Sequence, residues 1–142
     1  MTIAELIEQI ARQLDDAGLC FGHGTDNARD EAAWLVLHVA GAPLDGSFTD
    51  WGMEVSPQQL DRVQELAKER CEGRAPLAYL LGSAWFAGLE FEVNEQVLVP
   101  RSPLAELVRD QFQPWVRPDR VRRVLDMCTG SACIAIATAL NL

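Results

Sequence analysis

The chain has 142 residues, a length that suits one ordinary domain or a small domain joined to part of a second. Hydrophobic residues make up 49% of the sequence and charged residues 23%, a balance that excludes a disordered protein and predicts a packed core. The formal net charge of −9 argues against a protein dedicated to the backbone of DNA or RNA and favours a basic partner.

Membrane insertion, disulfides and metal sites are not expected. No apolar run approaches the roughly 20 residues needed to cross a bilayer, and the N-terminal residues carry acids where a signal peptide carries bases. We therefore expect a cytoplasmic chain with no membrane partner. The cysteines form no Cys-x-x-Cys pair and the histidines lie far from the C-terminal cysteines, which predicts neither a disulfide framework nor a metal site. These residues are Cys20, Cys71, Cys128, Cys133, His23 and His38.

Two amphipathic helices are predicted first. Apolar residues recur at helical spacing from Ile3 to Leu14, and Gly18 is placed to end that helix. The stretch 27–41 repeats the pattern and closes on another glycine. A turn-rich, aperiodic segment follows, which predicts a long loop.

A third helix is predicted from Ser56 to Gly73 because its start signals are complete. Ser56 is a good N-cap, Pro57 suits the first helical position, and Gln59 completes a capping box. The expected domain organisation is therefore a helical bundle over residues 1–75. Its third helix is expected to bury Leu60, Val63, Ala67 and Cys71.

The hydrophobic period then changes to that of strands. Residues 89–93 alternate apolar and polar side chains, and 96–99 resembles a second strand after a turn near Asn94, which predicts a β-hairpin. We expect residues 76–100 to form a connector containing this hairpin. A helix beginning at Ser102 and Pro103 is expected next.

The last part, 101–142, is predicted to contain a strand, a turn and a helix. Arg123–Met127 has the composition of a short buried strand, and an apolar helix begins near Ala132. A short basic run leading into this strand is interpreted as a solvated connector: Arg117, Arg120, Arg122 and Arg123. Strand, turn and helix in this order open a doubly wound α/β sheet, which needs several such units.

The stretch DMCTGSA, residues 126–132, has the features of a cofactor-binding turn. Gly130 permits a positive φ or a close ligand, Thr129 and Ser131 supply hydroxyls, and a helix start presents unpaired N–H groups. A dinucleotide fingerprint has three glycines, and here a cysteine and an alanine stand in neighbouring places. These residues alone leave an ordinary strand-to-helix turn open.

A pattern across residues 74–101 carries a family resemblance. Its residues are Arg74, Pro76, Tyr79, Gly82, Phe86, Pro100 and Arg101. The pattern resembles the segment joining the helical and catalytic domains in the HemK and PrmC/PrmB family of protein glutamine methyltransferases. The whole chain follows the family's order. The tripeptide 102–104 resembles the PrmB branch, which methylates a glutamine amide of the third large-subunit ribosomal protein.

The resemblance implies an α+β chain: an N-terminal helical bundle for substrate recognition, a hairpin connector and the first strand-turn-helix of a Rossmann-like methyltransferase domain. It implies S-adenosylmethionine as cofactor and a basic ribosomal protein as partner, with no direct nucleic-acid binding. The cofactor-binding residues implied are Asp126, Cys128, Thr129, Gly130, Ser131 and Ala132. The substrate-side residues of the connector implied are Phe86, Pro100 and Arg101.

The resemblance also implies that the family's catalytic machinery lies beyond this sequence. Its ribose-binding acid and its Asn-Pro-Pro-Tyr loop are not reached, so we expect a truncated chain with no catalytic residue. An amide nitrogen is a poor nucleophile because its lone pair is delocalised, and the family is thought to position it with that loop. The chain alone is therefore expected to be inactive and to bind S-adenosylmethionine weakly or not at all.

Two other functions remain open at this point. An adenine-specific DNA methyltransferase would share the loop chemistry and the sheet, although the acidic balance argues against it. A non-catalytic module could dock a basic protein on the acidic helices. Because an isolated first strand covers neither of its faces, we also expect self-association through the unfinished sheet or poor order after about residue 120.

Overall fold

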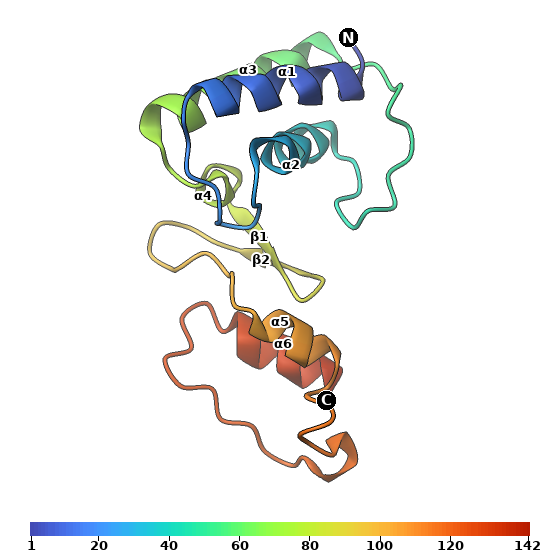
Figure 1. The fold of residues 1–142 in the computed structure, drawn as a ribbon, viewed down its shortest axis with the longest axis vertical. Coiled ribbons are helices and arrows are strands. Elements are labelled where there is room, and N and C mark those ends of the chain that lie inside the picture. Colours follow the sequence, from blue (N-terminus) through green and yellow to red (C-terminus); the bar gives the residue numbers. More distant parts are fainter. The chain divides into compact units, whose positions relative to one another are not determined.

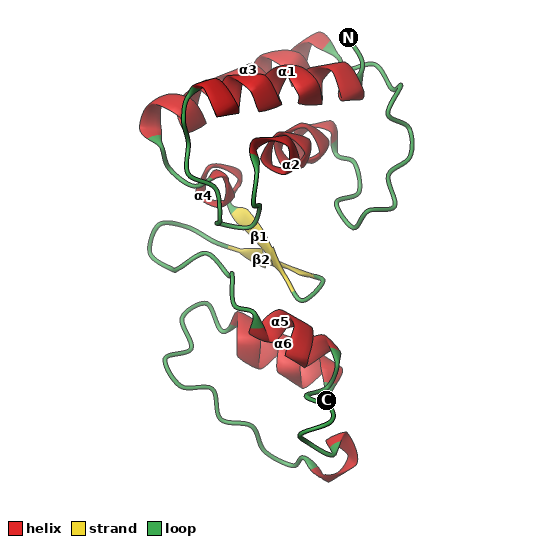
Figure 2. Cartoon of the chain, in the orientation of Figure 1, coloured by secondary structure: helices red, strands yellow, loops and turns green.

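The computed structural model describes all 142 residues and divides them into two compact units, Met1–Leu81 and Gly82–Leu142. The first unit consists of helices joined by loops, and the second combines helices with one two-stranded sheet (Figures 1 and 2). The predicted α+β class is thus confirmed. None of the helices is long and apolar enough to cross a membrane.

The helical unit consists of α1 (Ile3–Asp16), α2 (Ala28–Ala40), α3 (Pro57–Gly73) and the short α4 (Leu77–Leu81). Helix α1 packs against α2 and α3, and α4 contacts α2 and α3. The three long helices were expected from the sequence, whereas α4 was not. The largest fully buried side chains of the unit are Ile3, Leu6, Ile10, Leu14, Leu35, Val36, Val63 and Leu77.

The helix ends follow the expected signals closely. The Ser56 hydroxyl accepts a hydrogen bond from the Gln59 N–H while the Gln59 side chain accepts one from the Ser56 N–H, so the capping box is confirmed. Gly41 ends α2 in the left-handed conformation, with φ +69°. At the end of α3, however, Gly73 is still helical, and Arg74 adopts the left-handed conformation with φ +57°.

The second unit contains β1 (Ser83–Phe86), β2 (Leu89–Glu92), α5 (Leu104–Arg109), a short 3-10 turn at Pro118–Arg120, and α6 (Cys133–Asn141). The two strands are antiparallel. Helices α5 and α6 lie side by side (Figure 1). Helix α5 begins close to its expected start, where the Leu104 N–H donates to the Ser102 hydroxyl at 3.2 Å.

The β-hairpin exists, but its expected pairing is wrong. The strand at Leu89–Glu92 pairs with Ser83–Phe86, with Phe86 opposite Leu89, and not with residues 96–99. The reason is the two-residue turn at Ala87 and Gly88, whose φ values of +52° and +83° match the tight turns that suit the twist of a hairpin. Asn94 forms only a local turn after the second strand.

The strand expected at Arg123–Met127 is also absent. This segment has no partner strand, since the only sheet pairs β1 with β2, and it is drawn as a loop in Figure 2. The side chains of Val124, Leu125 and Met127 are 58%, 82% and 76% exposed, so the segment is not buried either. A strand is defined by its hydrogen-bonded neighbour, and the second unit supplies none for these residues.

Candidate cofactor-binding turn and comparisons with known proteins

The turn before α6 has an unusual backbone. Cys128, Gly130 and Ala132 all adopt the left-handed conformation, with φ of +60°, +56° and +62°. This conformation costs an L residue with a side chain about 1–2 kcal/mol, and such strain is concentrated at functional sites. Only one of the three residues is a glycine, so two residues with side chains hold a backbone conformation that glycine adopts more readily.

Hydrogen bonds within the turn hold this shape. The Thr129 hydroxyl donates to the Asp126 carbonyl at 3.1 Å, and the Ala132 N–H donates to the Thr129 carbonyl at 2.9 Å. Asp126 thus closes the turn through its backbone. The buried Oδ2 atom of its carboxylate has no hydrogen-bond partner in the chain.

The start of α6 leaves donors available beside this turn. The helix begins at Cys133, and Ala132 at its N-cap provides no side-chain hydrogen bond. The hydroxyl of Ser131 does not cap the helix, so its first N–H groups can donate to a ligand. A ligand with acceptor groups for these N–H groups and a donor for Asp126 would fit the surface formed by the turn and the start of α6.

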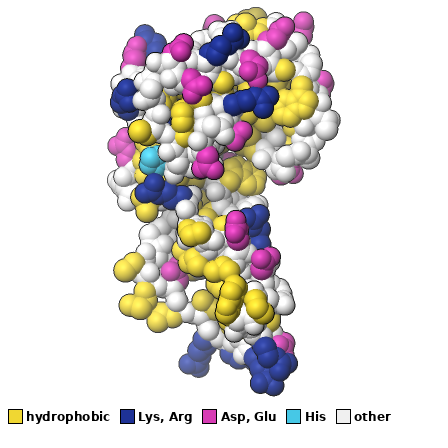
Figure 3. All heavy atoms as spheres, viewed as in Figure 1, with side chains coloured by type: hydrophobic (Ala, Val, Ile, Leu, Met, Phe, Trp, Pro, Cys, Tyr) yellow, Lys and Arg dark blue, Asp and Glu magenta, His cyan; other side chains and the backbone are white.

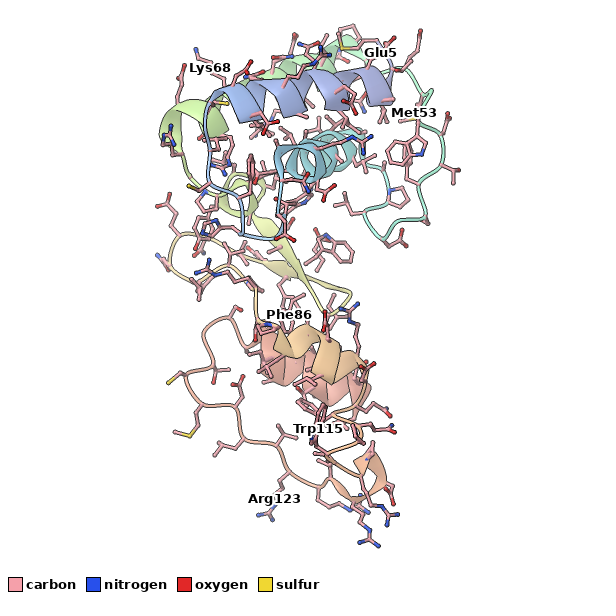
Figure 4. All side chains as sticks on the ribbon, in the orientation of Figure 1. Glu5, Met53, Lys68, Phe86, Trp115 and Arg123 are labelled. Atoms are coloured by element: carbon pink, nitrogen blue, oxygen red, sulfur yellow. The ribbon has the colours of Figure 1, made fainter.

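The connector residue Phe86 packs in the small core beside α6. Phe86 is 4% exposed and belongs to one buried cluster with Val108, Cys133 and Ala137, so the hairpin packs against residues of α5 and α6. Figure 4 labels Phe86 next to these helices. Pro100 is buried and Arg101 is exposed. Of the expected connector residues, only Phe86 is therefore found in the buried cluster that includes Cys133, the residue that follows the turn.

A hollow of about 340 Å³ lies between the segment 121–126 and α6. Its lining includes Asp126 and Thr138, and the Thr138 hydroxyl is also buried without a hydrogen-bond partner. Arg122 and Arg123 contribute to the rim. Asp126 and Thr138 thus each place a buried polar atom without a hydrogen-bond partner among the residues that line this hollow. No group of three His, Cys, Asp or Glu side chains is placed to hold a metal ion.

Sequence patterning did not identify a buried ion pair in the helical unit. The Arg70 Nε atom lies 2.6 Å from Glu31 Oε1, and the two side chains are only 3% and 4% exposed. Arg70 also donates to the Cys20 carbonyl, and Thr25 donates to Glu31, at 3.2 Å each. The sequence did contain a signal for this pair, because Glu31 and Arg70 each interrupt the apolar face of a predicted helix. The buried residues of α3 are Val63, Leu66, Ala67 and Arg70, whereas the expected Leu60 and Cys71 are only partly buried.

The motif residue Arg74 extends this network. Its guanidinium donates to the carbonyls of Ala17 and Gly18, at 3.1 and 3.3 Å, where α1 ends. Arg70 and Arg74 thus fasten the loop that follows α1 to the end of α3. The structure gives Arg74 a bracing contact within the helical unit.

Together these features define an α+β protein whose N-terminal helical domain precedes a strained turn at a helix start. Comparison with protein families agrees, because the PrmC N-terminal domain matches residues 5–82, more than half of the chain. The chain belongs to the PrmC N-terminal domain family. The resemblance noted in the sequence is confirmed.

The proteins that are similar to this chain over nearly its whole length share one name. The ribosomal protein uL3 glutamine methyltransferase of Xanthomonas campestris pv. campestris is 47% identical over 136 residues, covering 96% of this chain and 44% of that protein. The proteins of the same name from Bordetella pertussis and Neisseria meningitidis serogroup B are 46% and 40% identical over 140 and 139 residues. Those matches cover 98% and 97% of this chain, but 47% and 46% of the relatives. The chain thus spans less than half the length of these relatives.

Proposed function

We propose that these 142 residues provide the helical domain and the first cofactor-binding turn of an S-adenosylmethionine-dependent methyltransferase. Its proposed substrate is a glutamine side-chain amide of a large-subunit ribosomal protein. The observation that carries the proposal is the identity of 46–47% over nearly the whole chain to proteins named for this reaction on uL3. In this proposal the Rossmann-like sheet belongs to the part of the relatives that this chain does not cover.

The residues from Asp126 to Ala132 would hold the cofactor in this proposal. S-adenosylmethionine, when bound, supplies an electrophilic methyl group on a positively charged sulfur. The unpartnered carboxylate of Asp126 can accept a hydrogen bond from it, and the free N–H groups at the start of α6 can donate to its acceptor groups. Gly130 has no side chain and readily adopts its left-handed backbone, so it leaves this surface open to a ligand.

No residue of this chain is assigned a direct role in methyl transfer. The sequence contains no Asn-Pro-Pro-Tyr stretch to align an amide nitrogen, and no other paired groups replace it. We therefore expect no methyl transfer from the 142-residue chain alone. Its proposed contribution is to form one wall of the cofactor site and to recognise the protein substrate.

A chimeric enzyme tests the proposal. Residues 1–142 would replace the matching part of the Bordetella pertussis relative, and incorporation of radiolabelled methyl groups into purified uL3 would be measured. We expect the chimera to methylate uL3. Loss of methylation in a well-folded chimera would contradict the proposal.

Two variants of the chimera test the assigned turn. Asp126→Asn should raise the KM for S-adenosylmethionine by about tenfold, since a charge-assisted hydrogen bond contributes roughly 1.5–3 kcal/mol. Glu90→Gln is a matched control, because it removes one carboxylate from the exposed edge of the hairpin. Equal effects of the two substitutions would remove the turn from the proposed site.

A further inference from the structure

A groove in the helical unit lies outside the proposed cofactor site. It has a volume of about 370 Å³ and is lined by Ala4, Ile7 and Glu8 of α1, by Arg29, Asp30 and Ala33 of α2, and by Trp51 of the following loop. The groove thus has an apolar floor, an aromatic ring and two carboxylates. Trp51 is 46% exposed although it is a large apolar side chain.

The loop that carries Trp51 is held firmly against α1. The N–H of Ala4 donates to the Trp51 carbonyl at 3.1 Å, and the N–H of Ile3 donates to the Met53 carbonyl at 2.9 Å. The ring of Phe48 supports the Trp51 ring edge to face, with the centroids 5.1 Å apart. Figure 4 shows Met53 on the loop beside the start of α1, where Glu5 is labelled. An exposed aromatic ring on a fixed loop is a preorganised contact.

The charge of the helical unit indicates the partner. Residues 1–81 hold fourteen Asp and Glu against six Arg and Lys, a formal net charge of −8, whereas 82–142 is nearly neutral. Acidic side chains are spread over the visible face of this unit (Figure 3). Such a field attracts cations to the groove. A guanidinium or ammonium group can then stack on Trp51 and reach Glu8 or Asp30.

We propose that this groove docks a basic polypeptide segment, with an arginine or lysine side chain lying on Trp51. Glu8 is paired with Arg29 at 2.8 Å in the free protein, but both side chains are more than half exposed, at 52% and 73%. An exposed pair of this kind is easily exchanged. The incoming cation therefore competes with Arg29 for Glu8, and Arg29 acts as a resident substitute for the ligand.

This competition can be tested by measuring peptide binding. A fluorescein-labelled twelve-residue peptide of alternating arginine and serine is titrated with the 142-residue chain. Trp51→Leu should weaken binding about fivefold through loss of the aromatic face. Glu8→Gln should weaken binding about threefold, and Arg29→Gln should strengthen it about threefold. A glutamate-serine peptide of the same length should not bind.

Matched controls come from a similar exposed pair on α3, Arg62 and Glu65, whose atoms lie 2.5 Å apart. Arg62→Gln and Glu65→Gln change the net charge as the groove variants do, but should leave binding unchanged. If the substitutions at Arg62 and Glu65 changed peptide binding as much as those at Arg29 and Glu8, the attraction would be diffuse and the docking proposal would be wrong. Absence of peptide binding by the folded chain would also contradict the proposal. If Trp51→Leu fails to fold, the proposal is still tested by the opposite changes in peptide affinity expected for Glu8→Gln and Arg29→Gln. The experiment uses no cofactor, so its outcome is separate from that of the methyl-transfer proposal.

Discussion

Glu31 and Arg70 form a buried ion pair, so removing one partner should lower the free energy of unfolding of the helical unit strongly. Arg70→Met should destabilise the helical unit by about 3–5 kcal/mol, because the carboxylate of Glu31 would be left buried without its partner. The double variant Glu31→Leu with Arg70→Met should recover most of that loss, since it removes both charges. Urea denaturation followed by circular dichroism measures the three free energies of unfolding.

An exposed arginine provides the comparison for this experiment. Arg62→Met removes the partner of Glu65 at the surface, where both side chains are more than half exposed. Its effect should stay below about 1 kcal/mol. If Arg70→Met cost no more than Arg62→Met, the buried pair would not have the stabilising role that its contacts with Cys20 and Thr25 indicate.

Burial also distinguishes the cysteines chemically. Desolvation raises the pKa of the Cys71 thiol, whereas the side chains of Cys20 and Cys128 are exposed to solvent. The thiolate is the reactive form, so a raised pKa and restricted access both slow alkylation. At pH 8, iodoacetamide should modify Cys20 and Cys128 well before Cys71, as measured by mass spectrometry of tryptic peptides. Faster labelling of Cys71 would contradict this packing.

At the scale of elements, the start of α3 depends on its capping box. Ser56→Ala should cost about 1 kcal/mol, because the Gln59 N–H loses the acceptor that the Ser56 hydroxyl provides. Thr49→Ala, in the exposed loop before this helix, should have almost no effect. Urea denaturation of the two variants compares them directly. Equal midpoints would show that the box does not stabilise α3.

The sequence predicted the helices well because residues within each segment determine where a helix begins and ends. The first three helices begin and end where caps, prolines and glycines indicate, to within a residue or two. The hairpin pairing was missed because it depends on a turn at Ala87 and Gly88, a weaker signal than the expected turn at Asn94. A strand at Arg123–Met127 needs a neighbour from elsewhere, which no local pattern can supply.

The candidate turn shows the same division between local and distant causes. Its residue types indicated a cofactor turn, and the structure adds the left-handed backbone at Cys128 and Ala132. That conformation was not deducible, because a cysteine and an alanine ordinarily avoid it. The buried pair of Glu31 and Arg70 joins positions 39 residues apart, so a sequence pattern could show two misplaced charges but not their contact.

At the scale of the whole molecule, apolar surface remains open in the second unit. Leu125, Met127 and Leu140 are 82%, 76% and 68% exposed, and apolar side chains form a patch over the region of α5 and α6 (Figure 3). Such a surface favours association of two chains. Amides of residues 122–127 should exchange rapidly with deuterium in dilute solution and become protected as concentration rises. Rapid exchange at every concentration, with a monomer in light scattering, would contradict this.

The two units should also unfold separately, because their cores differ in size. The cluster of the helical unit contains sixteen buried residues, whereas the cluster formed by Phe86, Val108, Cys133 and Ala137 contains four. Buried apolar area is the main source of stability, so Gly82–Leu142 should unfold at a lower urea concentration than Met1–Leu81.

Tryptophan positions make this difference measurable within one chain. Trp34 and Trp51 lie in the first unit, and Trp85 and Trp115 lie in the second. Fluorine NMR of the chain labelled with 5-fluorotryptophan should show the signals of Trp85 and Trp115 reaching their unfolded positions first. A single transition shared by all four signals would mean that the units fold as one cooperative body, and the small second core would then have to draw its stability from the helical unit.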